Sequence, residues 1–294
     1  ELDAVITLSP HVLHYEQNRA ALTKGLHVLS EKPLVCTIKD AKKLIAHAKK
    51  MKRVLMIAYQ RHFEPQFRYM RDQIAKGVLG EIQYVQAIQC QEWLKITENT
   101  WRQKKALSCG GQINDSGSHL IDIIMWVTGM QVKEVYAKMD NFGTEVDINS
   151  TVAMTFKNGA LATLLLSDTV SAPWSWETTS GENPAFPRTG QDAILVGGTK
   201  GSLAIPSLDL RWHEPGREDW LEPLVQRREP VIPADPYVEQ MRNFANVIRG
   251  SEAPVLTGRD GTVTLATTLA ITVSAETGRP VAVDEVLAAR RPAV

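Results

Sequence analysis

Strands and helices are predicted to alternate along the first 58 residues of this chain. Three runs rich in valine, isoleucine and leucine predict buried strands at residues 2–8, 26–29 and 54–58. Between them, apolar residues spaced three and four apart predict helices over residues 14–23 and 38–51. The order strand, helix, strand, helix, strand favours parallel strands joined by right-handed crossovers. Because the strands are continuously apolar, we expect both faces of this sheet to be covered.

The pattern changes after Tyr59, where polar and apolar residues begin to alternate. Half-buried strands are predicted at residues 83–91, 132–139, 149–156, 161–168, 193–196 and 202–205. Helices are predicted at residues 65–76, 116–127, 237–248 and 263–277, with a last short strand at 281–283. Consecutive strands with few helices between them favour a largely antiparallel sheet. We therefore predict an α/β domain over residues 1–60, with a parallel sheet, followed by an α+β domain over residues 61–294.

Charge and hydropathy exclude some classes of partner. The 294 residues contain 33 Lys and Arg against 33 Asp and Glu, which leaves no net charge to attract nucleic acid or an anionic membrane. No apolar run reaches the ~18 residues that predict a membrane span. The N-terminus lacks the basic and then apolar pattern of a secretory signal. We therefore expect a cytoplasmic protein with neither nucleic acid nor a membrane as its partner.

The cysteines are few, scattered and odd in number. They are Cys36, Cys90 and Cys109. This pattern fits reduced thiols better than a disulfide framework. Cys109 lies beside Gly110 and Gly111, but the sequence places no activating partner next to it, so we do not expect a nucleophile there.

An acid and an imidazole stand four residues apart at the start of a predicted helix. Asp115 and His119 follow a glycine-rich loop, and positions i and i+4 share one face of a helix, so both can point into a cleft. Lys32 follows a predicted strand and precedes the rigid Pro33, which could bring it to the same cleft. Together the three form a set for proton transfer. The alternatives are a surface Lys32 and a structural His119 that hydrogen-bonds with Asp115. No third ligand follows at zinc-like spacing, so we predict no metal site.

The chain resembles the Gfo/Idh/MocA family of nicotinamide-dependent oxidoreductases over nearly its whole length. Residues 25–34, GLHVLSEKPL, are similar to the family's G-K-H-V-L-x-E-K-P-L signature. Residues 110–122, GGQINDSGSHLID, are similar to its G-G-x-x-x-D-x-G-x-H-x-x-D motif. Residues 2–14 and 54–65 resemble the late Rossmann strands and the segments that follow them. The two motifs stand in the family's order, about 80 residues apart, which makes the resemblance specific.

This resemblance implies a reaction. It is hydride transfer between NAD or NADP and a hydroxyl-bearing carbon of a sugar, polyol or related small molecule. Hydride leaves such a carbon only as its hydroxyl proton leaves, so a base must stand nearby. We assign the base to His119, whose ordinary pKa suits neutral pH. Asp115 is expected to orient the imidazole or the substrate hydroxyl, and Lys32 to stabilise negative charge on the substrate oxygen.

The resemblance also implies an architecture and a set of cofactor contacts. A dinucleotide-binding domain is joined to a domain with a large open sheet, through whose face members often form homodimers or homotetramers. Asp122 is expected to cap or pack rather than react, and many relatives have Asn where His11 stands. The residues expected near the cofactor are Ser9, Pro10, His11, Glu31, Lys32, Gln60, Arg61, Trp101 and Arg102.

The glycine-rich G-x-G-x-x-G loop of the family does not appear in these residues. Its glycines let the backbone approach the cofactor pyrophosphate at a helix N-terminus. Residue 2 already corresponds to a late Rossmann strand, so residues 1–60 match only the C-terminal half of that domain. We expect the other half to precede residue 1 in the natural protein. The alternative, a true truncation, exposes a sheet edge and apolar surface.

Substrate choice is expected to come from residues 92–102 and from the long segment 171–191, which shows no periodicity. Trp174 and Trp176 in that segment could cover a substrate ring. The alternative is that they anchor the loop or fill a subunit interface.

Two other functions remain open on the same fold. One is a ligand-sensing regulator, against which the intact set of Lys32, Asp115 and His119 argues. The other is a non-catalytic, degenerate subunit, with which the absent glycine loop is consistent. Binding of NAD(H) or NADP(H), followed by turnover of a sugar or polyol, separates the enzyme from both.

Overall fold

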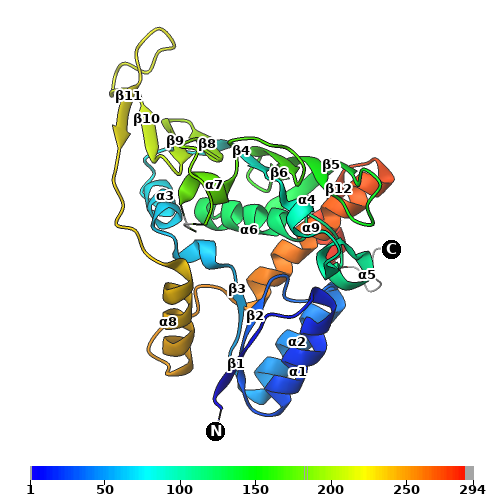
Figure 1. The fold of residues 1–294 in the computed structure, drawn as a ribbon. Helices are drawn as coiled ribbons and strands as arrows, with labels where there is room; N and C mark the ends of the chain where they lie inside the picture. Colours follow the sequence, from blue (N-terminus) through cyan, green and yellow to red (C-terminus); the bar gives the residue numbers. More distant parts are fainter. Residues whose placement is uncertain (1, 182, 184, 289–294) are drawn as a thin grey trace.

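A small parallel sheet forms at the N-terminal end of the computed structural model, which describes residues 2–181, 183 and 185–288. Its strands lie in the order β1-β2-β3, and all pairs are parallel. The strands and the two helices that connect them are β1 (Ala4–Thr7), α1 (His14–Thr23), β2 (His27–Glu31), α2 (Ile38–Met51) and β3 (Leu55–Ala58). The predicted strand–helix alternation and parallel pairing are therefore confirmed (Figure 1).

Local sequence sets the limits of α2. The Thr37 hydroxyl accepts a hydrogen bond from the Asp40 backbone N–H at 3.1 Å, which satisfies one of the free amides of the first turn. Ala41, Leu44 and Ala48 recur at helical spacing and are buried. The helix therefore has one apolar face against the sheet and a charged face toward solvent.

A nine-stranded sheet makes up most of the rest of the fold. Its strands lie in the order β11-β10-β9-β8-β4-β7-β6-β5-β12. Every pair is antiparallel except β4 with β7, so the prediction of a largely antiparallel sheet is confirmed. The strands are β4 (Ile82–Cys90), β5 (Val132–Asp140), β6 (Asn149–Phe156), β7 (Leu161–Ser167), β8 (Ile194–Gly198), β9 (Gly201–Ile205), β10 (Asp209–Trp212), β11 (Val225–Arg228) and β12 (Val281–Ala282).

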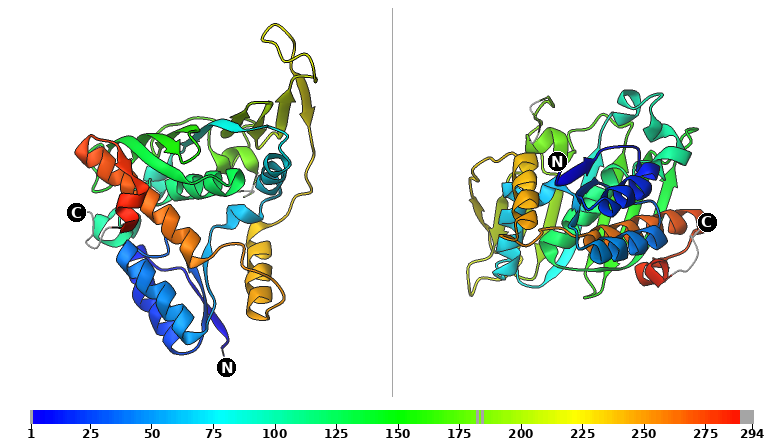
Figure 2. Two further views of the ribbon diagram at one scale, coloured as in Figure 1. Left: turned by 180° about the vertical axis from the view of Figure 1, so that it is seen from behind. Right: turned by 90° about the horizontal axis from the view of Figure 1, so that it is seen from below.

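Helices cover one face of this sheet (Figures 1 and 2). The longer ones are α3 (Pro65–Ala75), α6 (Ser116–Thr128) and α9 (Gly258–Thr277). Helix α8 (Pro236–Ile248) instead packs on the small parallel sheet, where its Phe244 joins Leu29, Met56 and Ala58 in one apolar cluster. The short helices are α4 (Trp93–Ile96), α5 (Lys105–Ser108), α7 (Trp176–Ser180) and α10 (Val283–Ala288), with 3-10 turns at His11–Leu13, Gln60–Phe63 and Trp101–Gln103. Helix α9 begins five residues before the predicted start, because Thr257 and Asp260 form a capping box.

Helix α9 packs against both sheets. It contacts α2 and β3 of the small parallel unit and β5, β12 and α6 of the large one. One continuous helix therefore fixes the two sheets relative to each other.

The other face of the large sheet carries exposed apolar side chains. Along β7, Leu161 and Leu165 are exposed, whereas Ala162, Leu164 and Leu166 are buried against the helices. This alternation is the half-buried strand pattern. Within the described residues, no helix combines the length and apolarity needed to cross a membrane.

Candidate active site

A cleft with a volume of about 660 Å³ opens at the carboxyl end of the small parallel sheet. Ligands of open α/β sheets bind at this edge. Of the residues predicted from sequence, nine line it: Ser9, His11, Glu31, Lys32, Gln60, Trp101, Arg102, Asp115 and His119. Pro10 and Arg61 do not line it. The segments at 92–102 and 171–191 also contribute lining residues, including Trp93, Ile96, Ser175 and Glu177.

Lys32 and Asp115 meet in this cleft although they lie 83 positions apart in sequence. The Lys32 ammonium donates to the Asp115 carboxylate and also to its backbone oxygen at 2.9 Å. The two side chains are 11% and 19% exposed. Lys32 lies at the end of β2, in a cis peptide bond with Pro33. The expected convergence of the two motifs is therefore present in the structure.

Asp115 is placed by a tightly packed glycine loop ahead of α6. A β-carbon on Gly111 would collide with the backbone of Asp147. The Asp147 carboxylate in turn accepts from the backbone N–H groups of Gly111 at 2.7 Å and Ile113 at 2.8 Å. Asp115 occupies the N-cap position but makes no capping hydrogen bond with its side chain. Its carboxylate therefore faces Lys32 rather than its own helix.

The charges around Asp115 keep it ionised. Burial alone raises the pKa of this carboxyl, but the Lys32 ammonium, its hydrogen bond and the Arg102 guanidinium together hold the pKa well below its usual range. The Arg102 Nε lies 3.4 Å from the second carboxylate oxygen. Asp115 therefore supplies a fixed negative charge between two cations.

His119 lines the same cleft one helical turn later. Its ring lies edge-on to the buried Tyr59 ring, with 5.4 Å between centroids. Burial first, and then the positive charges of Lys32 and Arg61, hold the pKa of His119 well below its usual range. The imidazole is therefore neutral at neutral pH. Its Nδ1 is buried and has no hydrogen-bond partner among the described residues. Asp115 forms its ion pairs with Lys32 and Arg102 instead.

His11 joins the two loops that border the cleft. Its Nδ1–H donates to the Ser108 carbonyl at 2.6 Å, and its ring lies edge-on to Trp101, with 4.7 Å between centroids. Burial, followed by the Lys32 charge, lowers the pKa of His11 to about 3. His14, which was not predicted, reaches the carbonyl of Pro33 at 2.8 Å and that of Ser9 at 2.9 Å. In the sequence, its position one helical turn after His11 was the feature that could have indicated a place near the cleft.

Arg61 lies behind the cleft rather than in it. It is 2% exposed, and its Nη2 donates to Glu177 at 2.6 Å. Glu177 also accepts from Gln89 and from the Ser175 hydroxyl. The expected contact of Arg61 with a cofactor stays a prediction, and in the structure its guanidinium bonds to Glu177 instead of lining the cleft. The missed residue is Glu177, which lines the cleft and lies in a segment without periodicity.

The two tryptophans of the segment 171–191 do not line the cleft. Trp176 is fully buried, stacks on Phe67 with 4.3 Å between ring centroids, and donates from Nε1 to Glu64 at 3.0 Å. Trp176 therefore anchors the loop, as the alternative interpretation had it. Trp174 is 42% exposed. Residues 182 and 184 of this segment lie outside the described residues.

Two of the cysteines contradict the expectation of reduced thiols. Cys36 and Cys109 form a disulfide, with 5.8 Å between their Cα atoms, and Cys90 is free and buried. They lie 73 residues apart, so only the tertiary fold brings them together. Asp122 is buried and bonds to His62 and Thr264, as its predicted packing role requires.

The residues of the cleft fit the nicotinamide end of a dinucleotide. Hydrogen-bonding side chains of Ser9, His11 and Gln60 line it at the carboxyl edge of the parallel strands, and so do the Lys32 and Arg102 cations. His119, whose Nδ1 has no hydrogen-bond partner among the described residues, lines the same cleft. Among the described residues, no group of three or more His, Cys, Asp or Glu could hold a metal ion.

Two family models match this chain. One describes an oxidoreductase family with an NAD-binding Rossmann fold and matches residues 1–59. The other describes the GFO/IDH/MocA C-terminal domain and matches residues 67–204. The expected cofactor class, NAD or NADP, agrees with the first of these models.

Individual proteins match over almost the whole chain. The 1,5-anhydro-D-fructose reductase of Ensifer adhaerens is 28% identical over 97% of this chain and 80% of that protein. The myo-inositol 2-dehydrogenase of Thermotoga maritima is 24% identical over 97% of this chain and 81% of that protein. Among solved structures, the aldose-aldose oxidoreductase of Caulobacter crescentus, complexed with glycerol, matches with a TM-score of 0.78 and 25% identity, over 95% of this chain and 79% of that one.

Proposed function

Because the chain belongs to the Gfo/Idh/MocA family of NAD(P)-dependent oxidoreductases, we propose that it transfers a hydride between NAD or NADP and a hydroxyl-bearing carbon. The substrate class is a sugar, polyol or related small molecule, as in the relatives named anhydrofructose reductase and inositol dehydrogenase. The observation that carries the proposal is the meeting of Lys32, Asp115 and His119 in one cleft.

His119 is the proposed base. When bound, the nicotinamide ring accepts or returns the hydride. The neutral imidazole of His119 takes the hydroxyl proton in the oxidising direction and returns it in the reducing direction. Burial and the nearby cations keep this imidazole unprotonated, so it needs no prior loss of a proton at neutral pH.

Lys32 and Asp115 form the proposed electrostatic part of the site. The Lys32 ammonium donates to the substrate oxygen and stabilises the negative charge that develops there. Asp115 holds the ammonium in place through the contacts described above. The cleft is partly enclosed by the segments at 92–102 and 171–191, and such enclosure strengthens charge interactions.

The remaining predicted residues are assigned by position. Ser9, His11, Glu31 and Gln60 contact the cofactor from the parallel sheet, which we propose belongs to a dinucleotide-binding domain of residues 1–60. Within the second proposed domain, residues 61–294, Trp101 and Arg102 approach it from the opposite wall of the cleft. Pro10 shapes the loop, and Arg61 acts through Glu177.

Substitution of His119 tests the proposal. With the natural protein, titration by NADH or NADPH fluorescence should show binding, and a panel of sugars and polyols should reveal turnover. His119→Ala should lower hydride transfer by ~10²-fold or more and leave cofactor binding largely intact. His47→Ala is the matched control, because His47 of α2 contacts Thr23 of α1 and does not line the cleft.

The outcomes separate the candidate functions. Equal rates for wild-type protein and His119→Ala remove His119 from the mechanism. If the protein binds a sugar but transfers no hydride, the ligand-sensing regulator is favoured. Lys32→Ala should lower kcat and raise KM. If it changes neither, the assigned cleft is wrong.

A further inference from the structure

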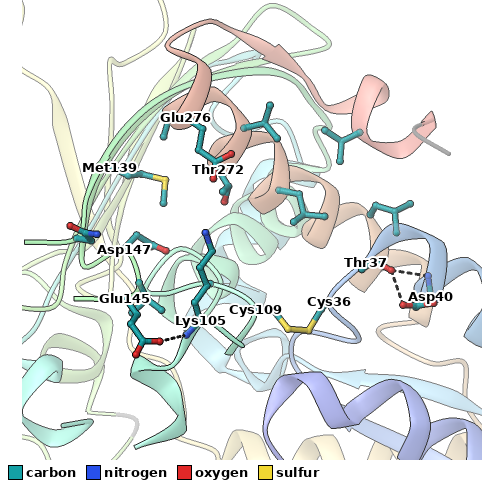
Figure 3. Close-up of a pocket in the computed structure, with 18 of the residues that line it drawn as sticks. Cys36, Thr37, Asp40, Lys105, Cys109, Met139, Glu145, Asp147, Thr272 and Glu276 are labelled. Atoms are coloured by element: carbon teal, nitrogen blue, oxygen red, sulfur yellow. Dashed lines mark hydrogen bonds between the residues drawn. A yellow bond between two sulfur atoms is a disulfide. The ribbon is translucent and has the colours of Figure 1, made fainter. Parts of the chain in front are cut away.

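The Cys36–Cys109 disulfide joins the two loops that carry the charged residues of the cleft. Cys36 lies four residues after Lys32, between β2 and α2, and Cys109 lies six residues before Asp115. Figure 3 shows the bridge between these loops. It therefore links the parallel-sheet side of the cleft to the antiparallel-sheet side.

Cys109 occupies a backbone conformation that favours glycine. Its φ is +61°, at the C-cap of α5. A residue with a β-carbon is less stable in this region than glycine is. The chain thus carries a cysteine where the backbone does not favour one, directly opposite a second cysteine.

A second cavity, with a volume of about 780 Å³, opens onto this disulfide. Both cysteines line it and both are partly exposed. Its other walls include Thr37, Lys105 and Glu145 (Figure 3). It shares no lining residue with the active-site cleft. A small molecule can therefore reach the sulfur atoms without entering the cleft.

Charged side chains of both signs line the cavity. Lys39 and Lys105 are close in sequence to the two cysteines, and the carboxylates are Asp40, Asp140, Glu145, Asp147 and Glu276. A thiolate is the species that attacks a disulfide, and nearby cations favour it. In contrast, Cys90 is 3% exposed, and burial raises the pKa of its thiol, so it is a poor competitor for exchange.

We propose that Cys36–Cys109 is a site of reversible thiol–disulfide exchange with a low-molecular-weight thiol that enters through this cavity. A first thiolate attacks one sulfur, the protein S–S bond breaks, and the released cysteine thiolate takes a proton while a mixed disulfide forms. A second small thiolate attacks the small-molecule sulfur of the mixed disulfide, the bond to the protein sulfur breaks, and the other cysteine leaves as a thiolate that takes a proton. Two small thiols are thereby oxidised, and the protein gains two thiols.

Reduction loosens the connection between the two loops. Lys32 remains bound to Asp115 across it, and His11, which lies outside both loops, still donates to the Ser108 carbonyl at 2.6 Å. The oxidised form therefore holds the cleft in the arrangement described above, and the reduced form joins the loops through fewer contacts, so that they move more. This inference goes beyond hydride transfer and does not rest on it.

The test compares oxidised and reduced protein without substrate or cofactor. Mass spectrometry should find the Cys36–Cys109 linked peptides after aerobic purification, and graded mixtures of reduced and oxidised glutathione should interconvert the two forms while the protein stays folded. Reduction should speed amide hydrogen exchange in residues 32–37 and 108–115 by roughly 10-fold or more. It should also lower Tm by roughly 5–10 °C.

Variants keep the test interpretable. The double variant Cys36→Ser/Cys109→Gly should match the reduced wild-type protein and show no further response to glutathione; glycine suits the φ of position 109. Cys90→Ser should retain the full response. The proposal fails if no linked peptides form, if reduction requires denaturant, or if reduction leaves exchange in both loops unchanged. All of these readouts are independent of turnover, so failure of the hydride-transfer proposal remains a separate result.

Discussion

Three imidazoles stand in and beside the cleft: His11 and His14, which are buried, and His119, which is half-buried. Burial is the largest cause that lowers the pKa of each one. Each therefore stays neutral at pH values where an exposed histidine begins to protonate. Lys32 adds to this effect at all three positions.

The lowered pKa of His119 predicts where activity falls with acid. Protonation of the base abolishes its function, and here protonation requires a pH well below 6.5. The profile of kcat/KM against pH should therefore show no loss of activity centred at pH 6.5. An acid limb at or above this pH contradicts the assignment of His119 as the base.

The lowered pKa of His11 predicts a loss of stability in acid. Its folded-state pKa of about 3 lies below the unfolded value of 6.5, so its contribution is present above pH 6.5 and is lost as pH falls toward 3. Between pH 6.5 and about 5 the loss should be about 2 kcal/mol. Urea unfolding at both pH values should show a smaller loss for His11→Asn than for wild-type protein. The control His47→Asn should lose as much unfolding free energy in acid as wild-type protein. If His11→Asn loses as much as His47→Asn, the prediction is wrong.

Sequence motifs predicted the set of Lys32, Asp115 and His119 because each lies in a local pattern tied to one strand end or helix start. They did not predict that Glu177 faces Arg61. That pair depends on the course of a segment without periodicity, which tertiary packing alone determines. The roles of these residues in catalysis stay predictions.

At the scale of the element, α7 holds one wall of the cleft in place. Trp176 inserts between Phe67, Arg61 and Glu64, while the next residue, Glu177, faces the cleft. Burying one large ring therefore fixes the position of a carboxylate that lines the proposed substrate site. The nearby Trp174 is 42% exposed instead.

Trp176→Ala should destabilise the protein by about 3–5 kcal/mol, because it removes a fully buried indole and leaves a cavity. Trp174→Ala is the matched control and should change the free energy of unfolding by less than about 1 kcal/mol. Chemical denaturation with both variants measures the difference. Equal effects would show that α7 is not anchored by Trp176.

Long elements were predictable to within one or two residues where periodicity and caps agreed, as in α1, α2 and β6. The strands β10 and β11 were missed, because four-residue strands at a sheet edge carry too little alternation to be recognised. The short helix α7 was missed for a related reason. Its position is determined by Trp176, and five residues carry no helical period.

At the scale of the whole molecule, the uncovered face of the large sheet is the proposed surface for homodimers or homotetramers. Leu161 and Leu165 on β7 and Leu195 on β8 are each more than 40% exposed, and these two strands flank β4. Tyr84 pairs with Leu161 across β4 and β7 and is 40% exposed. Exposed apolar side chains gathered on one sheet face are typical of a protein interface.

Leu165→Glu should therefore shift the assembly toward the monomer, because a carboxylate in the middle of an apolar interface loses its hydration. Light scattering coupled to gel filtration measures the mass. Leu221→Glu is the control, since Leu221 is 90% exposed but lies in the connection between β10 and β11, away from this face. A monomeric wild-type protein, or an unchanged mass for Leu165→Glu, removes the proposed interface.

The packing of α9 against both sheets has a mechanical consequence. Its first turn is in close contact with the small sheet, where a β-carbon on Gly261 would press on Ile57. Near its other end, the Ser274 hydroxyl accepts from the backbone of Ala137 in β5. A helix of this length is a stiff rod of about 30 Å. Any tilt of the parallel strands is therefore transmitted along this helix to β5 and β12, at the edge of the large sheet.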